Sequence, residues 1–577
     1  MASPWKRVDD EQERFWARMG SASVSRRAFL GGAGAAGLAT LLAACTGGRS
    51  PGSTTRTTLP PAQASALLQE QLQAARTLPK DVLLRLYQGY RADRAGEIIT
   101  VPLGFNYFDG GISHTTPWPY TQHVPMLWYG PGIVPERGRI DRQVTMADVA
   151  PTMARMIGFP AFQAPDGSLM EEVIDPSAPK PKLVVVLVWD AGGQYVLGLW
   201  PKSWPNLKAL MPKSTFYSNA TIGSSPSSTA PIHATLGAGA FPRRHGILDN
   251  FVRWPDGSLA DPWSQGPAGM LSPTLADQYA EALGSKVATG GFATLAWHIA
   301  MLGHGSQANP SVRQVAVLRE KGGGEGAEGI AWGLSDSLAP YYAFPDYVND
   351  LPPISTYFPV AEKIDGRKDG QWQGQDIESL NMGFNTPARV PYQQRAIEEV
   401  ITREGFGHHD QTDLFFINYK LIDEIGHLFT ASSLEERDSI VVQDANLPVL
   451  IDFLNRQVGE GQWVLLVTAD HGHSAATTVS GATPIKVNSV DASLEDHFHG
   501  SASSPLAEKI RPGWTYLSQG ALGRLGIDQE QVAAFMLALT KEQVAPEASA
   551  VPASELSADV LQAAFPASAL STLVPQG

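Results

Sequence analysis

Short runs of apolar residues recur along the chain, and several have the length and β-branched content of buried parallel strands. The clearest are Leu183–Trp189, Leu414–Tyr419, Val464–Thr468, Ile98–Val101 and Pro125–Tyr129. Helical periodicity fills intervals between them, over Asp148–Ile157, Ser272–Leu283, Gln394–Arg403 and Leu447–Asn455. Strands that alternate with helices in this way predict an α/β sandwich around a mostly parallel central sheet.

The last part of the chain has a different pattern. Residues 505–577 are rich in Ala and Pro, with helical periodicity over Asp528–Leu539 and Ser557–Ala564. We therefore expect a peripheral helical subdomain there, following a catalytic domain over residues 63–504.

The N-terminus has the pattern of an export signal. Arg26 and Arg27 precede the small and apolar run Gly31–Ala44, which is too short to span a bilayer but suits a signal peptide. The paired arginines predict recognition by the twin-arginine export machinery. Cys45 ends a bacterial lipobox-like segment, in which the cysteine is acylated. The sequence thus predicts a protein lipid-anchored outside the cytoplasmic membrane, with a signal peptide at 1–44 and a flexible tether at 45–62.

Composition narrows the possible classes. The single cysteine excludes a disulfide scaffold and a cysteine-based zinc finger. The formal net charge of −14 argues against a general nucleic-acid surface, because phosphate contacts need clustered Lys and Arg.

Carboxylates and imidazoles follow three of the predicted strands. Asp190 comes directly after one, Asp470 and His471 follow another, and Asp423 and His427 follow the third, one helical turn apart. Ligands of open α/β sheets bind at the carboxyl ends of strands, so the three clusters should converge. An Asp–His pair by itself more often has a structural role than a metal-binding one. Together the three clusters favour a metal site, for which Asp and His suit Zn²⁺.

A hydroxyl-rich segment, Gly223–Leu236, supplies candidate nucleophiles. It is also typical of a solvated turn that caps a helix beginning at Pro231, with Thr229 or Ala230 near the N-cap. A hydroxyl at that position would face the positive end of the helix dipole, which favours a phosphoryl group. The structural and functional interpretations are therefore compatible.

These residues resemble the alkaline phosphatase superfamily, most closely its nucleotide pyrophosphatase/phosphodiesterase and PafA-like phosphatase branches. The resemblance rests on the strand ending in Asp190 with the Thr229 segment, Gly239–Asn250, the Asp-x-x-Gly-His motif from Asp423, and the Asp-His-Gly motif from Asp470. It implies that Thr229 is the nucleophile and that Asn250 helps to hold a non-bridging phosphoryl oxygen.

One family segment stands in an unexpected place. The block that ends the family's chains resembles residues 91–175 here, which implies a circular permutation. The final metal ligand is then His114. His123 is a lower-ranked alternative, as are His497 and His499, which stand where an unpermuted chain would carry this ligand.

The resemblance further implies two divalent metals, expected to be Zn²⁺. One would be held by Asp423, His427 and His114. The other would be held by Asp190, Asp470, His471 and the oxygen of Thr229. Thr229 would attack in line to form a phospho-enzyme, which water then releases.

The substrate expectation rests on a missing motif. PafA-like monoesterases carry a Lys-x-Arg pair that holds the terminal phosphate oxygens, whereas the comparable stretch, Ala293–Met301, has no Lys or Arg. We therefore expect a small-molecule phosphodiester or pyrophosphate to be the better substrate, with phosphomonoesterase activity as the alternative. A non-catalytic cell-surface binding lipoprotein is the alternative from another class.

Overall fold

The computed structural model describes residues 61–108, 114–319, 331–501, 503–545 and 551–574. The predicted signal peptide, Cys45 and nearly all of the predicted tether lie outside these residues. The chain divides into two compact units. Unit 1 comprises Met1–Pro79, Gly96–Gly110 and Gly481–Leu573, and unit 2 comprises Lys80–Ala95, Gly111–Ser480 and Val574–Gly577. Among the described residues, no helix has both the length and the apolar character needed to cross a bilayer.

Unit 2 is built on an eight-stranded sheet of order β11-β10-β14-β5-β15-β3-β6-β4. In chain order its strands are β3 (Met126–Tyr129), β4 (Gly138–Thr145), β5 (Leu183–Trp189), β6 (Thr215–Thr221), β10 (Thr289–Phe292), β11 (Gln314–Val317), β14 (Asp413–Tyr419) and β15 (Trp463–Thr468). Neighbouring strands are parallel except where β3 runs against β15 and β6. The predicted α/β class with a mostly parallel sheet is confirmed.

The three central strands end at the same level. In β14, β5 and β15 every residue is buried, which explains their uninterrupted apolar sequences. Trp189 at the end of β5 lies opposite Tyr419 at the end of β14, and Thr468 at the end of β15 lies opposite Val188. The residues that follow these strands therefore emerge side by side.

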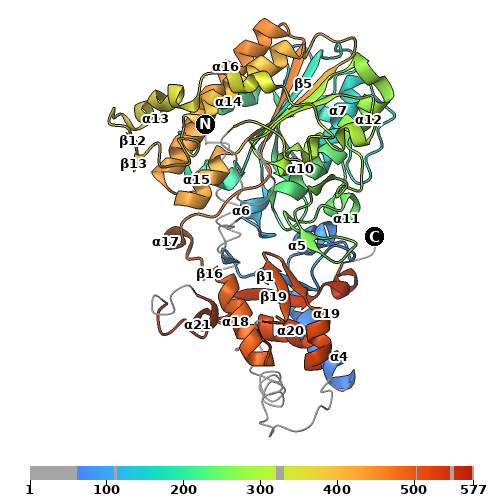
Figure 1. Cartoon of the computed structure of the whole chain (residues 1–577), viewed down its shortest axis with the longest axis vertical. Helices are drawn as coiled ribbons and strands as arrows, with labels where there is room; N and C mark the ends of the chain where they lie inside the picture. The colour runs from blue at the N-terminus through green and yellow to red at the C-terminus, as the bar shows by residue number, and fades with distance from the viewer. Residues whose placement is uncertain (1–60, 109–113, 320–330, 502, 546–550, 575–577) are drawn as a thin grey trace. The chain divides into compact units, whose positions relative to one another are not determined.

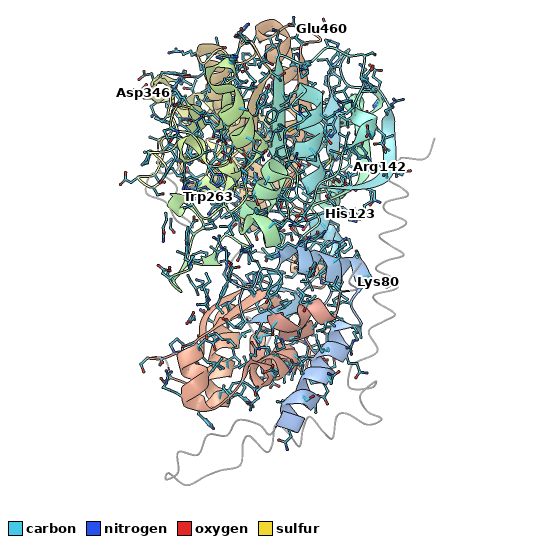
Figure 2. All side chains as sticks on the ribbon, turned by 90° about the vertical axis from the view of Figure 1, so that its right-hand side faces the viewer. Lys80, His123, Arg142, Trp263, Asp346 and Glu460 are labelled. Carbon is cyan, nitrogen blue, oxygen red and sulfur yellow. The ribbon has the colours of Figure 1, made fainter. Side chains whose placement is uncertain are left out.

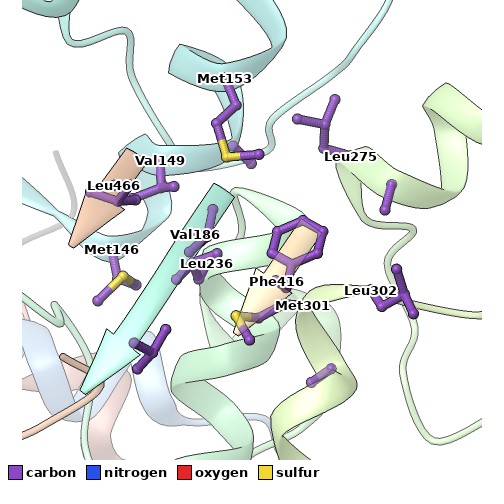
Figure 3. Close-up of a cluster of buried hydrophobic side chains, with 14 of the residues drawn as sticks. Met146, Val149, Met153, Val186, Leu236, Leu275, Met301, Leu302, Phe416 and Leu466 are labelled. Atoms are coloured by element: carbon purple, nitrogen blue, oxygen red, sulfur yellow. The ribbon is translucent and has the colours of Figure 1, made fainter. Parts of the chain in front are cut away.

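Helices cover both faces of this sheet, with α14 (Arg389–Arg403) and α16 (Leu434–Gln457) on one side (Figure 1). The other side carries α7 (Val149–Ile157), α10 (Thr229–Ala238) and α12 (Leu275–Leu283). There, Val186, Phe416 and Leu466 of the strands lie in one buried apolar cluster with side chains of the covering helices (Figure 3). Side chains fill the interior between these layers (Figure 2).

Unit 1 contains an antiparallel sheet of order β17-β18-β1-β19. Its strands are β1 (Ile98–Pro102), β17 (Ala507–Arg511), β18 (Trp514–Leu517) and β19 (Leu561–Pro566), and its longer helices are α4 (Pro61–Ala75), α18 (Val487–Phe498), α19 (Gln519–Leu525) and α20 (Gln529–Leu537). Side chains of the strands, α18 and α20 share a separate apolar core.

Unit 1 corrects two expectations. The predicted helical subdomain 505–577 is not a unit by itself, because residues up to Leu573 join residues from before 80, from 96–110 and from 481 onward in one sheet-containing unit. The predicted helix Ser557–Ala564 is wrong: Ser557 lies in a turn, Asp559 forms a bridge with Thr540, and the last residues belong to β19. Pairing with β1 and burial override the helical propensity of Leu561, Ala563 and Ala564.

Three further expectations need adjustment. Ile98–Val101 forms β1 of the antiparallel sheet rather than a parallel strand, and Pro125–Tyr129 supplies β3, the reversed strand of the large sheet. The predicted helix Leu447–Asn455 is the C-terminal part of α16, so Pro448 lies inside that helix. Proline cannot donate to the carbonyl four residues earlier, and Asn206 Nδ2 instead donates to Asp444 O at 3.2 Å.

Candidate active site

Two groups of candidate metal ligands lie at the carboxyl end of the central sheet. Group one is His114, Asp423 and His427, and group two is Asp190, Asp470 and His471. Within each group the possible ligand atoms all lie within 4.8 Å of one another. Five of these six residues follow β5, β14 or β15 directly or within one short helix, α15 (Leu421–Phe429). The expected convergence of the three clusters is what the structure shows.

Group two is buried throughout. His471 Nε2 lies 3.3 Å from Asp470 Oδ2 and 3.7 Å from Asp190 Oδ1. Asp470 Oδ1 accepts a hydrogen bond from the backbone N–H of Ala191 at 3.0 Å, which turns Oδ2 toward His471. Burial and the neighbouring Asp190 raise the pKa of Asp470 well above its usual value.

The Oδ1 oxygen of Asp190 faces His471, and its Oδ2 oxygen is held by two other partners. Asn418 Nδ2 donates to Asp190 Oδ2 at 2.9 Å, and His298 Nε2 lies 3.1 Å from the same oxygen. His298 Nδ1 accepts from the backbone N–H of Leu295 at 2.9 Å, so Nε2 carries the hydrogen that faces Asp190. These contacts leave Asp190 Oδ1 facing His471 Nε2 and Lys420 Nζ. His298 was missed as a site residue, because the contact depends on the distant segment 295–298.

Group one is assembled from two distant parts of unit 2. Asp423 Oδ1 lies 3.5 Å from His114 Nε2 and 3.3 Å from His427 Nε2. His114 Nδ1 donates to Ser227 O at 2.7 Å, which fixes the tautomer and leaves Nε2 as a metal-binding lone pair. The rings of His114 and His471 stack at 3.8 Å between centroids, so the two groups adjoin.

The donor atoms fit divalent metals. Among the described residues, Asp423 Oδ1, Asp470 Oδ2 and His471 Nε2 are buried without a hydrogen-bond partner. Buried polar atoms of this kind are costly unless something binds them. Carboxylate and imidazole donors in sets of three are typical of catalytic zinc, which keeps a further position open.

Lys420 is a site residue that the sequence reasoning did not find. Its Nζ lies 3.4 Å from Asp190 Oδ1 and also contacts Asp423 Oδ2. Burial opposes the charge of each group, but the mutual attraction prevails: it holds the pKa of Asp190 and Asp423 below the usual range and raises that of Lys420. The available signal was its position directly after the buried strand β14.

Thr229 is the first residue of α10 and is 2% exposed. His233, one turn later, donates from Nδ1 to Thr229 O at 2.8 Å, and its Nε2 accepts from Asn418 Nδ2 at 3.0 Å. Both nitrogens of His233 are therefore occupied within the protein. Because Asn418 also donates to Asp190, one side-chain amide joins the start of α10 to group two.

Asn250 lies beside the same helix start. Its Oδ1 accepts from the backbone N–H of Ala230 at 3.1 Å, and Ser228 Oγ donates to Asp249 Oδ1 at 2.9 Å. Ser227, which also precedes Thr229, is held by a different part of the chain: its Oγ donates to Thr116 O at 2.8 Å. The structure thus brings Thr229 and Asn250 to the edge that holds both groups.

The alternative ligands do not join either group. His123 (labelled in Figure 2) forms a backbone bridge with Thr221, and burial lowers its pKa to about 4. His497 stacks on Phe535, and His499 ends α18; both belong to unit 1. His473 does lie beside group one, with its ring centroid 4.9 Å from that of His427.

Comparison with known proteins identifies relatives. The family described as type I phosphodiesterase / nucleotide pyrophosphatase matches residues 184–542. The chain is 22% identical to alkaline phosphatase PhoV of Synechococcus elongatus, over 55% of this chain and 63% of that protein. It is 23% identical to alkaline phosphatase PafA of Elizabethkingia meningoseptica, over 51% of this chain and 60% of that protein.

The chain thus spans about three fifths of the length of these curated relatives. A crystal structure of a quadruple mutant of alkaline phosphatase PafA aligns with a TM-score of 0.46 at 18% identity, covering 63% of this chain and 77% of that one.

Proposed function

The chain belongs to the type I phosphodiesterase/nucleotide pyrophosphatase family of the alkaline phosphatase superfamily, a family of phosphoric-ester hydrolases, and on this premise we propose that it is a two-metal hydrolase with Thr229 as its nucleophile. The observation that carries the proposal is the pair of buried ligand groups beside the helix that begins with Thr229.

Zinc is the metal that these donors suit, and when bound by groups one and two it would act as a Lewis acid on the Thr229 hydroxyl and on the phosphoryl oxygens. The protein's own residues supply the rest. Thr229 stands at the positive end of the α10 dipole, where a phosphoryl group is favoured. Asn250 would donate from its side-chain amide to a non-bridging oxygen, a role supported by its Oδ1, which accepts from the backbone N–H of Ala230.

The proposed substrate is a small phosphodiester or pyrophosphate. The stretch Ala293–Met301 reaches the site through His298, which contacts Asp190, and it carries no Lys or Arg. Phosphomonoesters are the alternative, favoured by the names of the curated relatives and by the buried cation Lys420.

Substrate preference and the nucleophile can be tested together with the zinc-loaded protein. We expect a higher kcat/KM for bis-p-nitrophenyl phosphate than for p-nitrophenyl phosphate. Thr229→Ala should lower kcat by about 10³-fold or more with zinc content unchanged. Thr235→Ala is the matched control, because Thr235 lies on the same buried helix and bonds Pro231 O and His245. Normal turnover by Thr229→Ala would refute the nucleophile, and the reverse substrate ranking would refute the diesterase assignment.

Two further parts of the proposal concern the chain as a whole. We propose that residues 91–175 are the family's C-terminal segment in a circularly permuted chain. The match that begins at residue 184 and the contribution of β3 and His114 to the central sheet and group one support this. We also propose export and lipid anchoring at Cys45. Membrane association that persists in Cys45→Ala would contradict the anchor.

A further inference from the structure

Lys420 touches one carboxylate from each ligand group. Its ammonium group lies 3.4 Å from Asp190 Oδ1 in group two and contacts Asp423 Oδ2 in group one. The Lys420 side chain is only 6% exposed. Among the described residues, no other Lys or Arg is ion-paired with Asp190, Asp423 or Asp470.

The backbone fixes this position. Tyr419 ends β14 directly opposite Trp189, and the backbone N–H of Asp190 donates to Tyr419 O at 3.0 Å. Lys420 and Asp190 thus directly follow the paired ends of β14 and β5. Lys420 is also the N-cap of α15, where the helix dipole disfavours a cation. The carboxylates that Lys420 contacts offset this local cost.

The charge of the site gives Lys420 a consequence beyond packing. The two groups bring three carboxylates into a buried region, and Lys420 pairs with two of them, Asp190 and Asp423. An uncompensated buried charge destabilises a fold strongly. A permanent ammonium group beside metal ligands also repels an incoming divalent cation.

We propose that Lys420 is a positioning residue that serves as a fixed counter-cation shared by both groups: it holds Asp190 and Asp423 in place, stabilises the protein when no metal is bound, and weakens divalent-metal binding. The inference rests on the proposed function, in that the two groups bind metal. It concerns the free energies of folding and of metal binding, which activity alone does not report.

The test compares the full-length mature protein with Lys420→Met, each purified with zinc and then stripped with a chelator. We expect the stripped variant to have a Tm lower by on the order of 5–10 °C, because it buries two carboxylates without their cation. In the zinc-loaded form the loss of Tm should be clearly smaller. Zinc titrated calorimetrically should bind about tenfold or more tightly to Lys420→Met than to the wild type.

Arg142→Met is the matched control. Arg142 pairs with Glu172 at 2.6 Å, and Glu172 belongs to neither group. Its loss should lower Tm by the same amount with and without zinc and leave zinc affinity unchanged. Lys420→Arg, which retains the charge, should keep the wild-type Tm of the stripped protein.

If Lys420→Met is too unstable to purify, a second background keeps the test decisive. In Asp423→Asn one carboxylate is neutral, so the double variant Asp423→Asn/Lys420→Met should be stable enough to purify although Lys420→Met alone is not. A double variant as unstable as Lys420→Met would overturn the inference. So would weaker zinc binding by Lys420→Met, or a Tm loss that does not depend on zinc. A wild-type protein that binds no zinc would refute the proposed function instead.

Discussion

The two ligand groups are built differently although their rings stack against each other. Group two has two carboxylates and one imidazole, all buried, and its residues lie within three positions of the ends of β5 and β15. Group one has one carboxylate and two imidazoles, takes His114 from a distant segment, and leaves the His427 side chain 24% exposed. The comparison shows that the central sheet positions the residues of group two, whereas contacts between the segment at His114 and helix α15 position those of group one.

These differences predict unequal metal binding. Group two has two carboxylates where group one has one, and all three of its residues are buried. Its Asp190 is also held by Asn418 and His298. Group one is partly open to solvent and depends on a single carboxylate. We therefore expect group two to bind zinc more tightly and to exchange it more slowly.

The largest expected effect follows from neutralising Asp190. Asp190→Asn removes a carboxylate that faces His471 and Lys420, so group two should lose its metal and kcat should fall by about 10³-fold or more. Metal content measured by elemental analysis after gel filtration should fall from two zinc ions per chain to about one. His427→Asn is the comparison from group one. Two zinc ions retained by Asp190→Asn would contradict the assignment of group two.

An intermediate effect is expected in the order of zinc release. Titration with a chelator should remove one zinc ion at a concentration roughly tenfold lower than the other, because the partly exposed His427 makes group one the weaker position. His427→Asn should abolish binding of the easily removed zinc ion (the weak class) and leave the tightly bound zinc ion (the tight class) in place. The tight class disappearing in that variant would reverse our ranking of the two groups.

The same contrast explains how much of the site was predictable. Group two follows from buried apolar strands whose ends must align in a parallel sheet, so Asp190, Asp470 and His471 could be placed together from sequence. Asp423 and His427 follow from helical spacing. His114 depended on a family resemblance, since its place is set by a hydrogen bond to Ser227 that no local pattern encodes.

The fold shows the same division. The central strands and the helices between them were recognisable because long apolar or periodic segments determine their own structure. The antiparallel unit was not recognisable, because β1 and β19 lie far apart in the chain and pair only in the folded protein. Leu561, Ala563 and Ala564 have good helical propensity, and the local sequence does not indicate that this segment pairs with β1. His298 was missed for a similar reason, since its partner Asp190 follows another strand. Lys420 also contacts Asp190, although its second partner, Asp423, is only three residues away.

The effect expected for His298 is confined to one of the two zinc positions, so it distinguishes the two groups directly. His298→Gln removes the imidazole contact with Asp190 Oδ2 while the hydrogen bond from Asn418 remains. Partners behind a metal ligand typically change affinity by about 10–100-fold, so we expect that loss for the tight zinc class and no change for the weak class. His304→Gln is the matched control, because His304 contacts the carboxylate of Asp277 at 2.7 Å outside both groups. An equal loss in both zinc classes, or an equal loss in the control, would mean that His298 acts through general stability rather than through Asp190.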